Sequence, residues 1–183
     1  MQPFVCPFWM GYVLLNPLRK LFEHPDKLLG PFVEKGMLIL EPGCGMGFFT
    51  LPLARMTGPL GKIIAVDVQD KMISTLRKRA RKAGLLSRMD LRVAKQGHMG
   101  LEDVYGTVDL VAAIHMVHEV PDRVHFFRQI ADALKPGGTL FIAEPKGHVS
   151  RENFSTTIAV CRELGFKELA LNPPQKNRTL LQK

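Results

Sequence analysis

The chain has 183 residues, of which 46% are hydrophobic and 23% charged, and its formal net charge is +8. This length and balance predict one folded domain with a substantial core and exclude a low-complexity or fibrous chain. The positive charge permits an anionic partner but does not identify one. Much of it lies between Lys71 and Arg88, a stretch without acids that is typical of the solvent-facing side of a helix.

The cysteines and the N-terminus indicate a cytoplasmic protein. The three cysteines, Cys6, Cys44 and Cys161, lie far apart, and an odd number without a CxxC motif argues against a disulfide framework. The N-terminus is apolar but lacks the basic region and the cleavage motif of a signal peptide. Pro3 and Pro7 interrupt it, and its apolar run is too short for a transmembrane segment.

Apolar runs of strand length alternate with helical patterns along the chain. In chain order, the predicted elements are a helix over Pro25–Glu34, a strand over Met37–Glu41, a helix over Phe48–Met56, a strand over Ile63–Asp67, a helix over Lys71–Ala83, strands over Asp90–Lys95 and Val108–His115, a helix over Asp122–Leu134, a strand over Thr139–Ala143, a helix over Ser150–Leu164, and strands over Phe166–Leu171 and Arg178–Gln182. Ser150 is a suitable N-cap and Gly165 a suitable C-cap of the last helix.

This alternation predicts an α/β fold. Continuous apolar strands joined by helices are typical of a parallel sheet that is covered on both faces. The last two strands are joined by a proline-rich turn and form a hairpin-like pair. We therefore expect a doubly wound, mostly parallel seven-stranded sheet with helices on both faces and an antiparallel C-terminal hairpin strand. Residues 28–183 are expected to form this domain, and residues 1–27 an appendage or lid.

The stretch LEPGCGMGFFT, residues 40–50, places three alternating glycines between a predicted strand and a predicted helix. Such a turn lets a ligand approach the backbone closely. The dinucleotide fingerprint G-x-G-x-x-G fails, because Phe48 stands where its last glycine would be. A P-loop is excluded because no Lys-Ser/Thr pair follows the glycines.

Two acids suggest the chemistry of the ligand. Glu41 precedes the first glycine by two residues, and this position suits an ammonium group better than a pyrophosphate. Asp67 ends the next strand, close to the separation of about 20 residues at which an acid meets ribose hydroxyls. The pocket is therefore expected to take a ribose and an amino-acid-like cation.

The stretches LEPGCGMGFFT, AVDVQDKM, DLVAAIHMVHEV and LKPGG, in this order, resemble those of class I S-adenosylmethionine-dependent methyltransferases. The likeness runs from about Leu28 to the C-terminus, and it is nearest to the small-molecule and quinone-type branch. It implies S-adenosyl-L-methionine as the cofactor and S-adenosyl-L-homocysteine as the product.

The resemblance also implies which residues bind the cofactor. The methionyl part would lie against the glycine loop, whose candidate residues are Glu41, Gly43, Cys44, Gly45 and Gly47. Cys44 is expected to serve as a small packing residue and not as a reactive thiol.

The remaining cofactor candidates follow the next three strands. Asp67 would take the ribose hydroxyls and Val68 would lie against the adenine. Gln96 is the nearest polar candidate for the adenine amine, because the usual acid after the third strand is absent. Ile114 and His115 would border the sulfonium.

Few residues are needed for the chemistry, because the cofactor carries the activated methyl group and the enzyme mainly aligns the reactants. A base is required only if the acceptor must lose a proton. His115 is the first catalytic candidate, since it directly follows an apolar strand and imidazole titrates near neutral pH. Glu144, at the end of the fifth strand, is the second. For His118 and Glu119 a capping or salt-bridge role is expected.

Two other motifs are predicted to be structural. HMVHE, residues 115–119, differs from the HExxH zinc signature and has no evident third ligand, so we expect no metal. NPPQ, residues 172–175, resembles the Asn-Pro-Pro motif of amino-directed nucleic-acid methyltransferases. It has a glutamine in place of the aromatic residue and lies in the last hairpin, so it is predicted to be a turn.

The aromatic residues Phe4, Phe8, Trp9 and Tyr12 crowd the first residues of the chain. They predict either a lid that forms an apolar wall for the substrate or a helix that packs on the domain or on another subunit, as in a homodimer.

Three functional hypotheses follow. The first is a methyltransferase that acts on a small, apolar molecule. The second is an RNA methyltransferase that binds through the basic helix over residues 71–88, and the third is a non-catalytic S-adenosylmethionine-binding protein.

Overall fold

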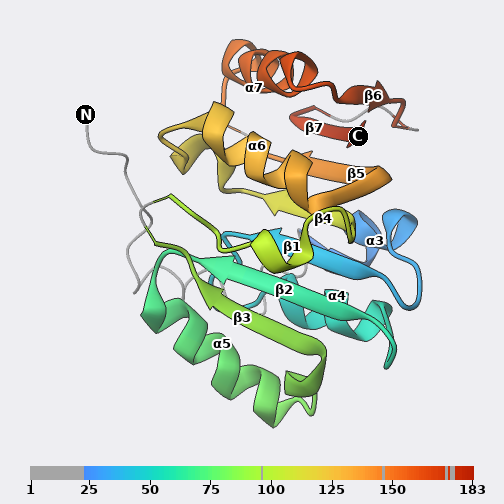
Figure 1. Cartoon of the computed structure of the whole chain (residues 1–183), viewed down its shortest axis with the longest axis vertical. Helices are drawn as coiled ribbons and strands as arrows, with labels where there is room; N and C mark the ends of the chain where they lie inside the picture. Colours follow the sequence, from blue (N-terminus) through green and yellow to red (C-terminus); the bar gives the residue numbers. More distant parts are fainter. Residues whose placement is uncertain (1–22, 96, 146, 172, 174–175) are drawn as a thin grey trace.

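The computed structural model describes residues 23–95, 97–145, 147–171, 173 and 176–183. Its centre is a seven-stranded sheet with the strand order β3-β2-β1-β4-β5-β7-β6 (Figure 1). The strands are β1 (Leu38–Pro42), β2 (Lys62–Asp67), β3 (Met89–Val93), β4 (Val108–Ile114), β5 (Leu134–Ala143), β6 (Lys167–Leu169) and β7 (Arg178–Gln182). Strands β1 to β5 are parallel, and β7 is antiparallel to both β5 and β6. The predicted fold is confirmed.

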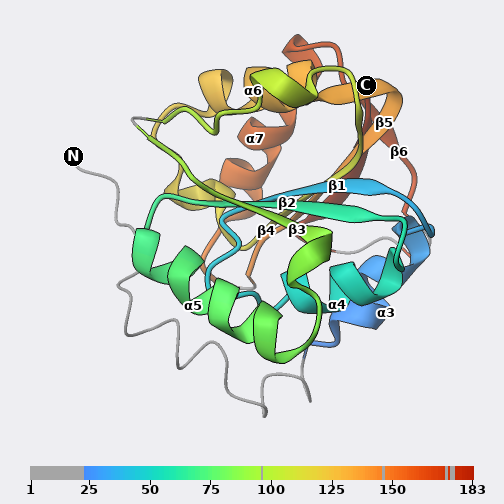
Figure 2. The same cartoon turned by 60° about the horizontal axis from the view of Figure 1, so that its bottom comes forward.

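Helices cover both faces of the sheet. One face carries α3 (Pro25–Leu29), α4 (Thr50–Met56) and α5 (Asp70–Lys82), and the other carries α6 (Arg123–Ala133) and α7 (Arg151–Glu163) (Figure 2). Short 3-10 turns lie at η1 (Gly30–Phe32), η2 (Leu86–Arg88), η3 (Glu102–Val104) and η4 (Val117–Glu119). The predicted cap of α7 is present, since the Ser150 hydroxyl accepts from the Asn153 N–H at 3.1 Å.

The core consists of two apolar layers separated by the sheet. Neighbouring residues of β1 enter different layers, because successive strand side chains point to opposite faces. Ile39 packs in the layer beneath α3, α4 and α5, and Leu40 packs in the layer beneath α6 and α7. Both side chains are fully buried. Their burial on two faces explains the unbroken apolar sequence of the central strands.

The first helix is shorter than its sequence pattern predicts. We expected Pro25–Glu34, but the α-helix ends at Leu29 and continues only as the 3-10 turn Gly30–Phe32. Pro31 explains the difference, because a proline lacks the N–H that would continue the helical hydrogen bonds.

The β5 strand begins earlier than expected. We predicted that the helix before it reaches Leu134 and that the strand starts at Thr139, but α6 ends at Ala133 and β5 starts at Leu134. Val108 pairs with Leu134 and Leu110 pairs with Thr139, so the intervening residues bulge out of an otherwise continuous strand. The β6 strand is also shorter than the predicted Phe166–Leu171 and spans only Lys167–Leu169.

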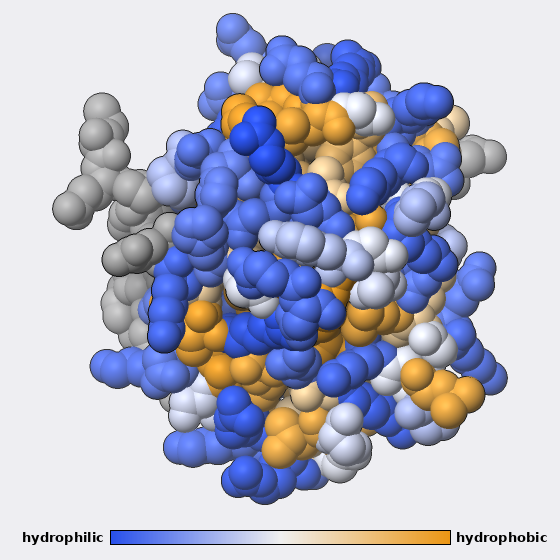
Figure 3. All heavy atoms as spheres, viewed as in Figure 1, coloured by the Kyte–Doolittle hydropathy of each residue, from blue (hydrophilic) through white to orange (hydrophobic). Residues whose placement is uncertain are grey.

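Some predictions fall on residues outside the described ranges. These are the N-terminal aromatic cluster with its lid or homodimer role, Cys6, Gln96 and most of NPPQ. Among the described residues, no helix combines the length and the apolar character that crossing a membrane requires. Hydrophilic side chains cover most of the face shown in Figure 3, and the hydrophobic ones form separate areas on it.

Candidate active site

A cavity of about 420 Å³ lies at the carboxyl ends of β1, β2 and β4. The strand order reverses between β1 and β4, which is the place where open α/β sheets bind their ligands. The lining consists of residues 41–46 and 48–49 of the glycine loop, 66–69 and 72 around the start of α5, 94, 97 and 99 after β3, and 114–116, 119–122 and 125–126 after β4. No lysine or arginine of the described residues belongs to it.

The three glycines of the loop have different tasks. All three have positive φ, 66° at Gly43, 53° at Gly45 and 84° at Gly47, which favours glycine. A Cβ on Gly43 would lie 2.8 Å from the Met116 side chain, and one on Gly47 would lie 2.3 Å from Leu76. A Cβ on Gly45 would meet no atom within 4 Å. Gly43 and Gly47 therefore allow close packing within the protein, whereas Gly45 leaves open space in the cavity wall.

Glu41 is a buried acid with an unsatisfied oxygen. Its side chain is 3% exposed, and its Oε2 atom has no hydrogen-bond partner among the described residues. Burial raises the pKa of this carboxyl to about 8. The nearby Thr50 hydroxyl opposes the rise, and the charge of Asp67 adds to it. Because a buried carboxylate oxygen without a partner is costly, this position is suited to a cationic ligand.

Asp67 links the end of β2 to the glycine loop. Its Oδ2 accepts from the Gly45 N–H at 2.9 Å, and its Oδ1 accepts from the Gln69 N–H at 2.9 Å. Burial raises the pKa of Asp67, and the backbone N–H donors oppose that rise. The carboxylate therefore holds the loop in place and still presents acceptor lone pairs to the cavity.

Burial also raises the pKa of the Cys44 thiol well above its usual value, and the charges of Glu41 and Asp67 add to the effect. The thiol is 5% exposed and belongs to the apolar layer beneath α4. This environment keeps the sulfur protonated and unreactive.

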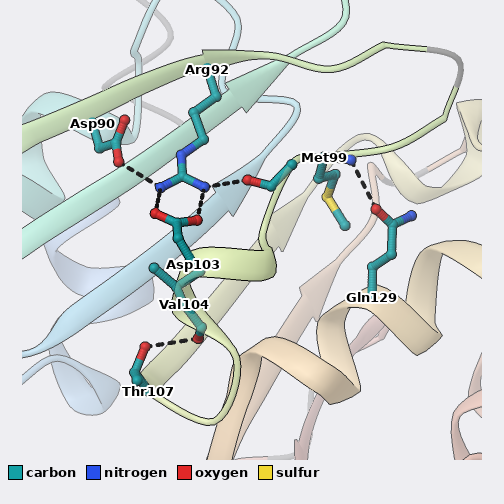
Figure 4. Close-up of polar contacts among 8 residues, drawn as sticks. Asp90, Arg92, Met99, Asp103, Val104, Thr107 and Gln129 are labelled. Carbon is teal, nitrogen blue, oxygen red and sulfur yellow. Dashed lines mark hydrogen bonds and ion pairs between the residues drawn. The ribbon is translucent and has the colours of Figure 1, made fainter.

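The part of the cavity wall that contains Val68, Met99 and Phe126 is apolar, and Gln129 of α6 supports it. Val68 is 56% exposed, which is unusual for a valine, and it faces a cavity that Met99 and Phe126 also line. The Gln129 side chain accepts from the Met99 N–H at 2.8 Å and donates to the Gly97 carbonyl at 3.0 Å. Gln129 thus holds the loop that follows β3 against the cavity (Figure 4).

A second brace fixes the other side of this loop. Arg92 pairs with Asp90 at 2.7 Å and with both oxygens of Asp103, at 2.7 and 2.8 Å, and also donates to the Gly100 carbonyl (Figure 4). Bidentate pairing with Asp103 raises the pKa of the Arg92 guanidinium. The predicted polar contact from Gln96 lies outside the described residues.

His115 stands at the end of β4 and lines the cavity. Its φ of 57° is unusual for a residue other than glycine. Its N–H donates to the Ala143 carbonyl at 2.7 Å, and its Nε2 lies 3.1 Å from Glu23 Oε1. The Phe49 ring packs edge-on against the imidazole, with 6.1 Å between ring centroids.

Glu144 is buried but does not line the cavity. Its Oε1 accepts from the His118 N–H at 2.9 Å, and its Oε2 lies 2.8 Å from His118 Nδ1. The hydrogen bond to Glu144 raises the pKa of His118, and its charge adds to the rise. This pair ties the end of β5 to η4, which carries part of the cavity wall.

The structure thus brings together most of the residues predicted from the sequence. Those that line the cavity are Glu41, Gly43, Cys44, Gly45, Asp67, Val68, Ile114 and His115. Within the described part of the chain, no three His, Cys, Asp or Glu side chains cluster in a way that could hold a metal ion.

Comparison with known proteins identifies the family. Residues 40–142 match the family model described as a methyltransferase domain. The chain belongs to the methyltransferase-domain family. This range extends from the glycine loop to the end of β5 and contains all of the cavity lining.

The methyltransferase domain is also similar to individual proteins. It is 30% identical to the ubiquinone biosynthesis O-methyltransferase of Xanthomonas axonopodis pv. citri, over 70% of this chain and 49% of that protein. It is 34% identical to the methyltransferase GfsG of Streptomyces halstedii, over 75% of this chain and 49% of that protein. The chain therefore spans about half the length of these curated relatives.

Among solved structures, a SAM-dependent methyltransferase from Aquifex aeolicus superposes with a TM-score of 0.82 at 22% identity, over 97% of this chain and 98% of that one. This agreement establishes the class I methyltransferase fold for nearly the whole chain.

Sequence reasoning missed two residues, Gln129 and Glu23, that do not line the cavity but contact the lining residues Met99 and His115. Gln129 and Glu23 carried no recognisable sequence signal, because each acts on a residue distant in the chain. Asp122 and His125 could have been considered, since Asp122 caps α6 by accepting from the His125 N–H at 2.9 Å. Both residues line the cavity.

Proposed function

We propose that this protein transfers a methyl group from S-adenosylmethionine to a small, largely apolar acceptor. The observation that carries the proposal is the unsatisfied Oε2 of buried Glu41, in the same cavity as Asp67 and the open space beside Gly45. A cofactor with an ammonium group and a ribose meets each of these requirements. The buried acid Glu41 in the wall beside the glycine loop disfavours NAD, whose anionic pyrophosphate would lie against that loop.

In the proposed complex, the residues of the chain bind and orient the reactants. Glu41 would accept a hydrogen bond from the cofactor ammonium, Asp67 would accept from the ribose hydroxyls, and Val68 would lie against the adenine. When bound, the cofactor would supply an activated methyl group on a sulfonium. Ile114 and His115 would border the reacting atoms and exclude water from them.

The acceptor class rests on the cavity wall and on the relatives. Met46, Phe48, Phe49, Val120 and Phe126 contribute apolar surface to the wall. One relative is named a ubiquinone biosynthesis O-methyltransferase, and an apolar acceptor suits the apolar wall of this cavity. The predicted direct role of Glu144 in catalysis is less well supported, because both of its oxygens already interact with His118.

The basic helix offers less support for an RNA methyltransferase. Arg79 donates to the Met46 carbonyl of the glycine loop, and Arg88 donates to the Ala54 carbonyl at 3.1 Å. These two residues therefore support the domain itself and engage N–H donors that would otherwise be available to phosphates. Cytoplasmic localisation stays a prediction, in agreement with the unpaired Cys44 and Cys161 among the described residues.

Isothermal titration calorimetry with S-adenosylmethionine, S-adenosylhomocysteine and NAD tests the cofactor. Both adenosyl compounds should bind and NAD should not. Asp67→Ala should weaken their binding about 10- to 100-fold, because it removes acceptors for the ribose and the anchor of the Gly45 N–H. Asp70→Ala, an exposed acid in the first turn of α5, is the matched control.

The control should bind like the wild type. Preferential binding of NAD, or full affinity in Asp67→Ala, would refute the cofactor assignment. A screen of metabolite extracts with a labelled methyl donor then identifies the acceptor, and tight cofactor binding without any transfer would favour the non-catalytic alternative.

A further inference from the structure

Glu23, in the segment that precedes α3, does not itself line the cavity but contacts His115, which does. Its Oε1 lies 3.1 Å from Nε2 of His115, at the far end of β4. The Glu23 side chain is 14% exposed and that of His115 is 22% exposed, so water screens this contact only partly. An acid outside the matched family range 40–142 thus contacts an imidazole that lines the candidate site.

The imidazole is held in one orientation from several sides. Its backbone has a φ of 57°, a conformation that costs energy for a residue other than glycine. The hydrogen bond from its N–H to the Ala143 carbonyl fixes the backbone, and the edge of the Phe49 ring packs against its side chain. Glu23 adds a polar contact to one of the two ring nitrogens, Nε2.

We propose that Glu23 is a positioning residue that holds His115 in the tautomer with the proton on Nε2. A carboxylate accepts hydrogen bonds, so the nitrogen that faces it carries the proton and the other nitrogen, Nδ1, carries the lone pair. The same carboxylate stabilises the imidazolium that forms when Nδ1 takes up a proton.

This inference rests on the proposed function, and it assigns to Glu23 and His115 the removal of the acceptor's proton during methyl transfer. An acceptor hydroxyl loses its proton to His115 Nδ1 while its oxygen forms a bond to the methyl carbon. The carbon–sulfur bond breaks and its electron pair stays on sulfur, which becomes a neutral thioether. Glu23 touches neither reactant and acts only through the imidazole.

The tautomer can be measured without knowing the acceptor. The protein is labelled with ¹⁵N-histidine, saturated with S-adenosylhomocysteine and studied by long-range ¹H–¹⁵N correlation at pH 8, where an ordinary imidazole is neutral. The chain has six histidines, and the His115→Asn spectrum assigns the His115 signals by their loss. We expect the Nε2–H tautomer in the wild type and a shift toward the Nδ1–H tautomer in Glu23→Ala.

Asp26→Asn is the matched control, since it neutralises an exposed acid of the neighbouring first turn of α3. It should leave the His115 signals unchanged. An Nδ1–H tautomer in the wild type, or an unchanged tautomer in a folded Glu23→Ala variant, would overturn the proposal. Thermal unfolding of each variant shows whether it is folded.

Kinetics with the acceptor from the labelled-methyl screen provide a second readout. Glu23→Gln should lower kcat about 10- to 1000-fold with little change in KM, as expected when a general base loses its orienting carboxylate. In a His115→Asn background the same change should have almost no further effect, because Glu23 acts through His115. Additive losses of kcat in the double variant would contradict the proposal. Calorimetric binding of S-adenosylhomocysteine tests the proposed function separately.

Discussion

Two buried acids at the carboxyl ends of the strands differ in whether their oxygens have hydrogen-bond partners. Glu41, near the end of β1, has an oxygen without a partner among the described residues, whereas both oxygens of Glu144, just after β5, interact with His118. Glu41 lines the cavity and Glu144 does not. Both side chains are almost fully buried, at 3% and 4% exposure, so burial alone does not distinguish them.

The difference shows how to separate a binding acid from a structural one. A buried carboxylate must find a partner or accept a proton, and Glu144 finds its partner within the chain. Glu41 instead has its pKa raised to about 8, which stores unfavourable energy that a cationic ligand can relieve. Glu41, the acid with an unsatisfied oxygen, is the one that we propose binds the cofactor ammonium.

The largest expected effect comes from Glu41→Gln. The folded pKa of about 8 lies above the ordinary value of 4.5, so the unfolded chain releases this proton while the folded protein retains it, and stability falls from about pH 4.5 to about pH 8. Removing the charge should therefore stabilise the ligand-free protein by roughly 2–5 kcal/mol at pH 8 and much less at pH 5. Urea unfolding at both pH values measures this difference.

The matched variant Glu144→Gln should have the opposite sign. This substitution removes the charge of a carboxylate whose two oxygens already interact with His118. It should therefore destabilise the protein by about 1–3 kcal/mol. Glu41→Gln should also weaken binding of S-adenosylmethionine and S-adenosylhomocysteine equally, because both carry the ammonium. A destabilised Glu41→Gln protein with normal affinity would contradict the comparison.

The second prediction compares two glycines of the loop. A methyl group on Gly47 would overlap Leu76, so Gly47→Ala should destabilise the fold by about 2–4 kcal/mol through overpacking and backbone strain. Gly45→Ala places its methyl in open space and should cost only about 1–2 kcal/mol for the positive φ.

Gly45→Ala should instead narrow the cavity and weaken cofactor binding. Thermal unfolding and calorimetry on the same two variants separate stability from affinity. Unchanged binding in Gly45→Ala would mean that the ligand does not approach this part of the loop.

The third prediction concerns the pair formed by Glu144 and His118. Because Glu144 raises the pKa of His118 in the folded state, the resulting stabilisation is fully present below about pH 6.5 and is lost as the pH rises through the raised pKa. His118→Gln should therefore lower stability by about 1 kcal/mol at pH 6, and the difference from the wild type should shrink toward pH 9. Urea unfolding midpoints across this range provide the test.

His148→Gln is the control for His118→Gln, because the His148 ring is exposed and its centroid lies 6.5 Å from that of His118. It should show little pH-dependent change. A loss of stability in His118→Gln that does not vary with pH would indicate that lost packing, and not a lost charge interaction, causes it.

The smallest effect is expected on the outer face of α5. Arg77, Lys78 and Arg81 are exposed and lie outside the cavity lining, so reversing all three to glutamate should leave cofactor affinity unchanged. Filter binding of a structured RNA at several salt concentrations is the accompanying measurement. Strong, salt-dependent binding that the reversal abolishes would revive the RNA hypothesis.

Much of the fold and part of the site could be predicted from the sequence. The alternation of buried strands and helices was sufficient for the sheet, because each central strand is apolar on both faces. The sequence predicted that Glu41, Gly45 and Asp67 share one site, because they follow from the spacing around neighbouring strand–turn–helix units, and all three line the cavity. Boundaries were less secure, as Pro31 and the bulge before Thr139 show.

The amino-acid sequence by itself determined the doubly wound sheet, the glycine loop and the acids around it, because these follow from the order of apolar, glycine and acidic residues along the chain. Only the tertiary structure decided that Glu144 is paired with His118, that Gln129 braces the loop after β3, and that Glu23 reaches His115. These contacts join residues from different elements, and whether a buried polar group is satisfied depends on where the whole fold places its partner.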